Sequence, residues 1–280
     1  MHEIQSGRDT DFDRLRKFDA LSSLSSPALI LLAGALALSD FRRYEIILRE
    51  AALASEANIL MRGVARVTCL GAHGERATVA LLAPGPIPEF PSHPISRSDF
   101  QCEAYSDCRV GSLTWRDFDR ILLNSSESAV KTFHENDLKH WYRLLLRSSS
   151  FFSLGLHERI GTALLELCSD FGIEDARGTL LSMSFSHQDI ASLVGATRPR
   201  VTEHLAQLER ENILIRQGRQ FIVCADKLDE SMNMHLMQGT EIHNPLADMR
   251  PKPTASLKLA GEVDSHRGRR IALHPSHALN

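Results

Sequence analysis

The chain has 280 residues, of which 43% are hydrophobic and 24% charged, with a formal net charge of -3. This length allows two domains with separate cores, and the composition excludes a fibre or a disordered chain. The negative net charge argues against a generally basic nucleic-acid binder, although a few well-placed side chains are enough to contact DNA phosphates.

A charged lead at residues 1–20 offers no secretory signal. The most apolar run, ALILLAGALAL, follows, and we expect a helix over residues 27–38. The run is about a dozen residues long, whereas a membrane span needs roughly 20. We therefore predict a cytoplasmic protein that makes no membrane contact.

Short runs with strand character follow, separated by turn signals at Arg62-Gly63 and at residues 71–74. The second signal, GAHG, is typical of a β-hairpin. Residues 84–99 hold five of the eleven prolines, which excludes regular helix or central strand there. The strands that we expect lie at residues 44–48, 58–61, 65–70, 77–82 and 109–113.

Apolar residues recur at three- and four-residue steps between residues 117 and 152, which predicts a long amphipathic helix. Such a helix has more apolar surface than one domain can cover. It either bridges the domains of its own chain or pairs with a second copy, and the pattern alone leaves both open. The apolar residues that we assign to this helix are Val130, Phe133, Leu138, Trp141 and Leu145.

Residues 186–226 are the most informative stretch. A first short helix has an apolar face between Ile190 and Val194, and Gly195-Ala196 ends it. We expect Thr197 to cap a second helix with its hydroxyl. Helix, three-residue turn and helix is a DNA-reading motif.

The second helix is expected to bury Val201, Leu205 and Leu208. Two strands then follow, with Arg219 at the tip of their hairpin, where it can contact a phosphate. A helical hairpin within another all-α domain is the alternative, but a Gly turn, a capped helix, early arginines and a Gly-Arg wing in this order argue against it. The exposed residues that we expect to read base edges are Arg198, Arg200, Thr202 and Glu203.

The segments HQDIASLVGATRPRVTEHLAQLERENIL and GRQFIV resemble the C-terminal domain of the Crp/Fnr bacterial transcription regulators. Residues 151–172, FFSLGLHERIGTALLELCSDFG, are similar to the family segment that ends the dimer helix and opens the winged helix. Residues 63–85 and 104–113 resemble the β-roll sensor domain. The likeness covers residues 20–230 and is strongest in the C-terminal third.

This resemblance implies an α+β fold with an N-terminal cyclic-nucleotide-binding-like β-roll, a long dimerisation helix and a C-terminal winged helix-turn-helix. It favours the dimer reading of the long helix, in a homodimer that binds double-stranded DNA, and it implies contact with RNA polymerase. The expected parts are the lead at 1–20, the β-roll at 21–116, the dimerisation helix at 117–152, the winged helix-turn-helix at 153–230 and a flexible tail at 231–280. The residues that match phosphate-binding positions of the family are Ser186, Gln188, Thr197 and Arg219.

Family members that bind cyclic AMP use a Gly-Glu pair for the ribose and an Arg-Ser pair for the phosphate. Here Glu89 follows a proline, and the register counted back from Ala104 puts Ser98 and Asp99 at the phosphate positions. An Asp carboxylate there repels a phosphate, so we predict a degenerate pocket and an unknown or absent effector. A one-residue bulge would restore Arg97, which keeps a cyclic-nucleotide-gated regulator as the alternative, with Glu89, Arg97 and Ser98 as the candidate pocket.

The five cysteines are scattered without metal-ligand spacing, so we predict no metal and no cofactor. A haem-gated regulator, with His73, His93 or a cysteine as ligand, also stays open. The sequence shows no nucleophile elbow, no phosphate-binding Gly loop and no HExxH motif, which argues against an enzyme. A protein-interaction module that no longer reads DNA is a third class, because Pro199 and Glu203 depart from the family pattern.

Overall fold

A computed structural model describes residues 11–49, 56–70, 76–88 and 100–238. Its N-terminal part holds a helical turn at residues 11–15, the 3-10 helix η1 (Asp19–Leu21) and helix α2 (Ser26–Ala35). The Ser25 hydroxyl accepts a hydrogen bond from the backbone N–H of Ala28 and so caps α2. Within these ranges, no helix is long and apolar enough to cross a membrane.

The helix predicted over residues 27–38 is too long at its C-terminal end. α2 stops at Ala35, and strand β1 (Ala37–Phe41) follows almost at once. β1 pairs antiparallel with β8 (Cys108–Thr114), with Leu38 opposite Gly111. The hydrogen bonds of this ladder override the helical preference of an alanine- and leucine-rich segment.

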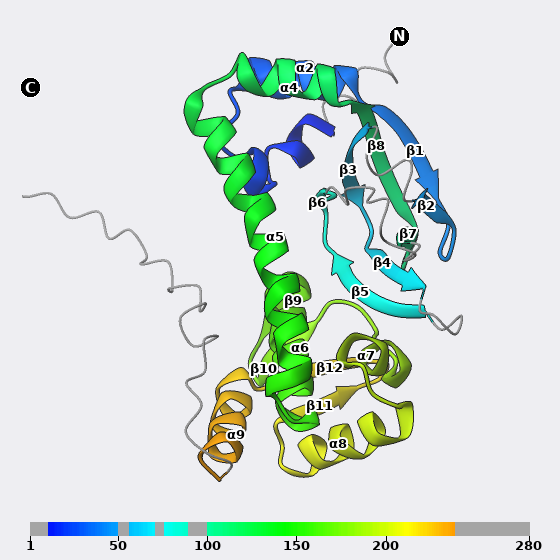
Figure 1. The fold of residues 1–280 in the computed structure, drawn as a ribbon, viewed down its shortest axis with the longest axis vertical. Coiled ribbons are helices and arrows are strands. Elements are labelled where there is room, and N and C mark those ends of the chain that lie inside the picture. The colour runs from blue at the N-terminus through cyan, green and yellow to red at the C-terminus, as the bar shows by residue number, and fades with distance from the viewer. Residues whose placement is uncertain (1–10, 50–55, 71–75, 89–99, 239–280) are drawn as a thin grey trace, which may run out of the picture. The chain divides into compact units, whose positions relative to one another are not determined.

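Two four-stranded antiparallel sheets form the N-terminal half (Figure 1). Their strand orders are β1-β8-β3-β6 and β2-β7-β4-β5. The other strands are β2 (Ile46–Arg49), β3 (Glu56–Arg62), β4 (Ala65–Leu70), β5 (Arg76–Leu82), β6 (Gly85–Pro86) and β7 (Phe100–Ala104). Leu60 of the first sheet and Val67 and Cys102 of the second are fully buried in one shared core. This arrangement is the expected β-roll.

All five strands predicted for the β-roll are present, whereas its strands β1, β6 and β7 have no counterpart in the prediction. β7 pairs with both β2 and β4, and it contains Glu103, which is buried against Arg66 of β4. A strand that buries a paired charge lacks the apolar alternation on which strand prediction depends. The predicted hairpin turn at residues 71–74 lies outside the described residues.

The single helix predicted over residues 117–152 is two helices, α4 (Trp115–Leu123) and α5 (Glu127–Ser153). Ser126 begins α5, because its hydroxyl accepts a hydrogen bond from the backbone N–H of Ala129 at 3.1 Å. The apolar period runs through this break, which explains why periodicity alone misses it.

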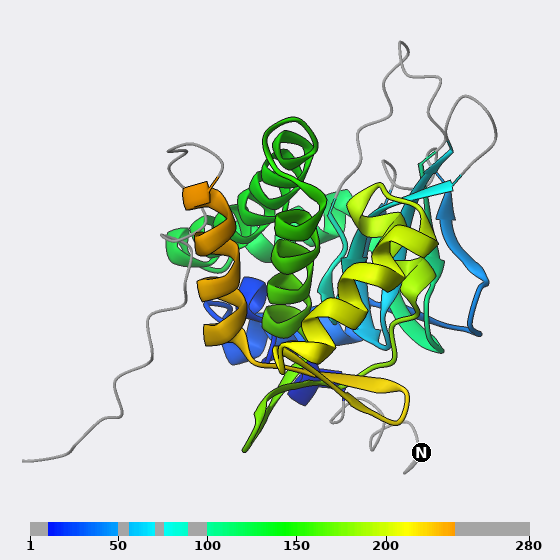
Figure 2. The same cartoon turned by 90° about the horizontal axis from the view of Figure 1, so that it is seen from below.

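The C-terminal region contains helix α6 (Leu156–Phe171), a sheet in the order β11-β12-β10-β9, and three more helices (Figures 1 and 2). These elements are β9 (Gly172–Asp175), β10 (Gly178–Leu181), α7 (His187–Val194), α8 (Arg198–Arg210), β11 (Leu214–Gln217), β12 (Gln220–Val223) and α9 (Ala225–Gln238). Ile160, Ile190 and Leu205 are fully buried in their common core. We call this region the winged region.

The flexible tail predicted from residue 231 is wrong for its first eight residues, because α9 continues to Gln238. Leu228 and Met232, four residues apart, are buried in the core of the winged region and attach α9 there. Residues 239–280 lie outside the described residues.

Candidate DNA-binding site

Local chemistry defines both ends of α7. The Ser186 hydroxyl accepts a hydrogen bond from the backbone N–H of Asp189 at 3.1 Å, and the Asp189 carboxylate accepts one from the backbone N–H of Ser186 at 2.8 Å. This reciprocal pair is a capping box. At the other end, Gly195 has φ +61°, a left-handed conformation that favours glycine. The predicted glycine turn is confirmed.

α8 is the expected second helix, and Val201, Leu205 and Leu208 are fully buried as predicted. Thr197 precedes it with extended backbone, but its hydroxyl makes no capping hydrogen bond, so the predicted hydroxyl cap is wrong. Such a cap binds the N–H of the second or third helical residue. Pro199 is the second residue and has no N–H to offer.

The outer face of α8 is open. The four side chains predicted to read bases are all exposed: Arg198, Arg200, Thr202 and Glu203. Among the described residues, Arg200 and Glu203 have no hydrogen-bonding or ion-pairing partner for their side chains, and so remain available to a ligand.

A polar network behind α8 was not predicted. Nδ1 of His187 lies 2.9 Å from the Thr202 hydroxyl, and Nε2 lies 3.1 Å from Nη2 of Arg216. Since a guanidinium only donates, Nε2 accepts, and the ring proton is on Nδ1, which donates to Thr202. Arg216 also binds Glu209 of α8 at 2.9 Å. Burial, followed by the charge of Arg216, lowers the pKa of His187 below its usual value.

The wing places a second arginine beside the N-termini of α7 and α8. Gly218 turns the chain between β11 and β12 with φ +61°, and Arg219 next to it is exposed. Ser186, Gln188, Arg198 and Arg219 line one open cleft of about 1220 Å³. Three of the four predicted phosphate contacts therefore lie with Arg198 around one cleft, while Thr197 is not among the lining residues.

The opposite wall of this cleft belongs to the β-roll, which sequence reasoning did not find. Arg43, Tyr44, Arg66 and Tyr105 line it. The guanidinium of Arg43 lies 4.7 Å from the ring centroid of Tyr44 and 5.6 Å from that of Tyr105, at cation–π distances. Five arginines and two aspartates line the whole cleft, so it attracts anions.

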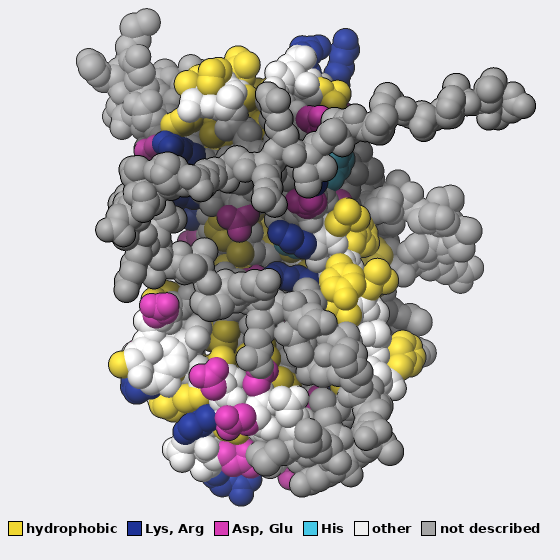
Figure 3. Space-filling model, turned by 90° about the vertical axis from the view of Figure 1, so that its left-hand side faces the viewer, with side chains coloured by type: hydrophobic (Ala, Val, Ile, Leu, Met, Phe, Trp, Pro, Cys, Tyr) yellow, Lys and Arg dark blue, Asp and Glu magenta, His cyan; other side chains and the backbone are white. Residues whose placement is uncertain are grey.

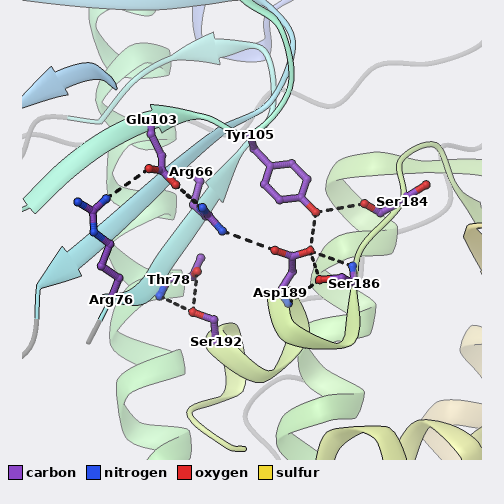
Figure 4. Close-up of polar contacts among 9 residues, drawn as sticks. All are labelled: Arg66, Arg76, Thr78, Glu103, Tyr105, Ser184, Ser186, Asp189 and Ser192. Carbon is purple, nitrogen blue, oxygen red and sulfur yellow. Dashed lines mark hydrogen bonds and ion pairs between the residues drawn. The ribbon is translucent and has the colours of Figure 1, made fainter. Parts of the chain in front are cut away.

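Side chains of the β-roll also reach α7 (Figure 4). The Tyr105 hydroxyl lies 2.9 Å from Oδ2 of Asp189, and Nη1 of Arg66 lies 3.5 Å from Oδ1. Oγ1 of Thr78 lies 2.8 Å from Oγ of Ser192. Burial, followed by the nearby Asp189 charge, raises the pKa of Tyr105, so its hydroxyl stays protonated and donates. We call these five residues the docking contact.

The residues predicted for dimerisation lie on two different faces of α5. Val130 and Phe133 pack against the core around α2 and α4, and Trp141 packs against the β-roll core. Leu138 and Leu145 point away from the chain, with 65% and 67% of their surface exposed. Hydrophobic side chains also come to the surface in the side view of Figure 3.

The candidate ligand pocket, Glu89, Arg97 and Ser98, lies outside the described residues, as do His73 and His93. A cavity between β5 and α5, lined in part by Leu82, His140 and Leu144, measures only about 30 Å³. Within the described part of the chain, no three His, Cys, Asp or Glu side chains group as metal ligands.

Comparison with known proteins agrees with this geometry. Residues 158–230 match the Crp-like helix-turn-helix domain family. The chain is 27% identical over 187 residues to the global nitrogen regulator of Synechococcus elongatus, covering 64% of this chain and 82% of that one.

Two solved structures share the fold. FixK2 from Bradyrhizobium japonicum has a TM-score of 0.57 at 19% identity, over 70% of this chain and 96% of its own. A Crp/Fnr-family transcriptional regulator from Thermus thermophilus has a TM-score of 0.54 at 21% identity, over 70% of this chain and 98% of its own. Regulators of this type are not enzymes. Residues 158–230 therefore form a Crp-like helix-turn-helix domain, in a chain whose fold is shared with these regulators.

Proposed function

We propose that the chain regulates transcription as a homodimer that reads DNA sequence through α8. The observation that carries this proposal is the exposed face of α8, on which Arg200 and Glu203 bind no other described residue. Arg198 and Arg200 suit guanine, whose O6 and N7 accept two hydrogen bonds, and Glu203 suits the amino group of cytosine. With Glu203, this surface should prefer different bases from those preferred by a regulator with arginine at that position.

Thr202 reads DNA in a fixed orientation. Because its oxygen accepts from Nδ1 of His187, its own O–H stays available to donate to a base or a phosphate. His187 and Arg216 are thus positioning residues for Thr202.

Phosphate contacts hold the helix in register. Ser186, Gln188 and Arg219 lie with Arg198 around one cleft at the N-terminal end of α7. A helix N-terminus attracts an anion, and Arg219 supplies a full positive charge. These residues, with Thr197, contribute affinity that is independent of DNA sequence.

The dimer forms along α5. The outward row Leu138, Tyr142, Leu145, Ser149 and Phe152 has steps of four, three, four and three residues, which is the spacing of a coiled-coil seam. Phe152 is 94% exposed and Tyr142 is 47% exposed. This row replaces Val130, Phe133 and Trp141, which already contact their own chain, and a two-fold axis along it presents two copies of α8 to successive turns of DNA.

The effector pocket is degenerate. Among the described residues, Trp141 and Leu144 of α5 pack against the β-roll core and leave a cavity of about 30 Å³ between β5 and α5, an order of magnitude below the roughly 300 Å³ at which ligand pockets begin. We also propose that the regulator acts in the cytoplasm and contacts RNA polymerase, because it resembles Crp/Fnr regulators. The domain borders that we propose are those predicted near residues 116 and 152.

A mobility-shift assay with genomic DNA fragments tests DNA reading. We expect the wild type to retard a subset of fragments and the double variant Arg198→Ala, Arg200→Ala to lose that selectivity. Arg210→Ala, on an exposed residue at the far end of α8, is the matched control and should behave as the wild type. Retardation of no fragment, or of all fragments equally, by the wild type would instead indicate an interaction module that does not read DNA.

A further inference from the structure

The β-roll contacts the winged region through one carboxylate that has two roles. Asp189 closes the capping box with Ser186 and also receives the Tyr105 hydroxyl at 2.9 Å. Because the capping box already fixes its orientation, the carboxylate presents Oδ1 to Arg66 in one direction, at 3.5 Å. Asp189, which helps to cap the N-terminus of α7, therefore also attaches α7 to the β-roll (Figure 4).

Arg66 is itself held in place from behind. Its Nε donates to Oε1 of Glu103 at 2.7 Å, and the Glu103 side chain is only 7% exposed. Arg76 lies 3.6 Å from the other oxygen of Glu103. With carboxylates on two sides, the planar guanidinium has little freedom to turn away from Asp189.

A second attachment lies about one helical turn further along α7. The backbone N–H of Thr78 donates to Oγ of Ser192 at 2.9 Å, and the two hydroxyls are 2.8 Å apart. One attachment point would allow α7 to pivot, whereas two points a turn apart fix its direction as well as its position.

Apolar packing joins the same surfaces. Val64, Leu81 and Tyr105 of the β-roll belong to the hydrophobic core of the winged region. Tyr105 also stacks on Phe185, with ring centroids 5.8 Å apart. A domain that moved freely would keep a core of its own, so this shared core favours one fixed arrangement.

We propose that the docking contact, by fixing α7, holds α8 in the orientation in which it binds DNA. Contacts within the chain then set this orientation without a bound effector. The proposal rests on the proposed function. The β-roll contacts α7 and leaves the outer face of α8 exposed. Arginines from the β-roll and from the winged region line the same cleft. An orientation fixed in advance removes an ordering cost from DNA binding. Arg66, Thr78 and Tyr105 act as positioning residues.

A reversible disulfide tests the orientation directly. The hydroxyl oxygens of Thr78 and Ser192 lie 2.8 Å apart, and the sulfurs of a disulfide lie about 2 Å apart, so the full-length double variant Thr78→Cys, Ser192→Cys should cross-link under mild oxidation. We expect the oxidised protein to bind its selected DNA at least as tightly as the reduced protein. The two single-cysteine variants control for oxidation of the native cysteines.

A conservative variant tests whether the contact contributes to affinity. Tyr105→Phe keeps the stacked ring and removes only the hydroxyl, and we expect DNA affinity to fall about tenfold, the low end for one lost hydrogen bond to a charged group. Ser112→Ala is the matched control, because it removes one hydrogen-bonded hydroxyl of the β-roll that does not line the cleft, and its affinity should not change. Adding the oxidised disulfide to Tyr105→Phe should restore affinity. Because a disulfide also adds general stability, thermal unfolding should show that the reduced Tyr105→Phe protein stays folded at the assay temperature.

The outcomes separate the two claims. A loss of more than tenfold in DNA affinity on oxidation, or failure of the cysteines to cross-link, overturns this inference while the proposed function stands. An unchanged affinity of Tyr105→Phe also overturns it. If no form of the protein binds DNA, the proposed function fails and the inference fails with it.

Discussion

Arg216 donates a hydrogen bond to Nε2 of His187 at 3.1 Å, across the gap between the wing and α7. The bond exists only while the imidazole is neutral, because a protonated ring has no acceptor. The tautomer of one histidine thus connects the wing to Thr202 on the reading helix.

This relationship predicts a pH dependence of stability. Burial, followed by the charge of Arg216, lowers the pKa of His187 in the folded protein, so between the usual value near 6.5 and the folded value the unfolded chain binds more protons. Stability should therefore fall as pH drops below about 6.5 and level off once the folded pKa is passed. Thermal unfolding from pH 7.5 to 5 should show a steeper decline for the wild type than for His187→Gln. Parallel curves would remove His187 from this role.

Removing a base contact and removing a phosphate contact should reduce DNA affinity in different ways. Arg198→Ala should cost about 1–3 kcal/mol on the selected site and relax preference at one base pair. Arg219→Ala should weaken selected and random DNA equally and lower the slope of log affinity against log salt by about one. Fluorescence anisotropy on both DNAs at several salt concentrations measures the difference. Equal losses on both DNAs for Arg198→Ala would contradict its assignment.

The seam on α5 predicts a charge-sensitive dimer. Leu145→Glu places a carboxylate in the outward row and should convert the dimer to monomers in analytical ultracentrifugation. Lys139→Glu changes an exposed residue on the same helix outside this row and should leave the dimer intact. Dissociation by both variants would point to a general charge effect instead of a seam.

Alanine substitutions at two glycines allow the cost of backbone strain to be distinguished from the cost of a packing clash. Gly195 and Gly218 both have φ +61°, but an added Cβ at Gly195 would lie 2.6 Å from the Phe151 ring, whereas one at Gly218 meets nothing within 4 Å. Gly218→Ala should cost about 1–2 kcal/mol of stability for the left-handed backbone alone. Gly195→Ala should cost more, because Phe151 at the end of α5 must also shift. Equal costs in chemical unfolding would show that this contact is soft.

The degenerate pocket predicts indifference to cyclic nucleotides. The described residues leave about 30 Å³ between β5 and α5, so neither cyclic AMP nor cyclic GMP should raise the unfolding temperature. A clear upward shift with either nucleotide would restore the alternative in which Glu89, Arg97 and Ser98 form a working site.

The sequence predicted those features that depend on neighbours along the chain. Gly195 ends α7 through its own backbone, and Val201, Leu205 and Leu208 share one face of α8 by helical spacing alone. These rules are local, so the helix-turn-helix and most strands of the β-roll were within reach.

Features set by distant residues were not within reach. The packing of Trp141 on the β-roll, instead of on a second copy, depends on where a sheet formed far earlier in the chain comes to lie. Tyr105 and Asp189 are 84 positions apart, and the residues around each of them do not predict their contact. Thr197 shows a local error, because the missing N–H of Pro199 was not weighed against the cap.

The most direct test of DNA reading is to sequence the fragments that the purified protein retains from a genomic library at moderate salt without added ligand. We predict an enriched palindrome whose half-sites lie one helical turn apart, since a dimer along α5 presents two copies of α8 at that spacing. Retention without any enriched sequence would contradict the account.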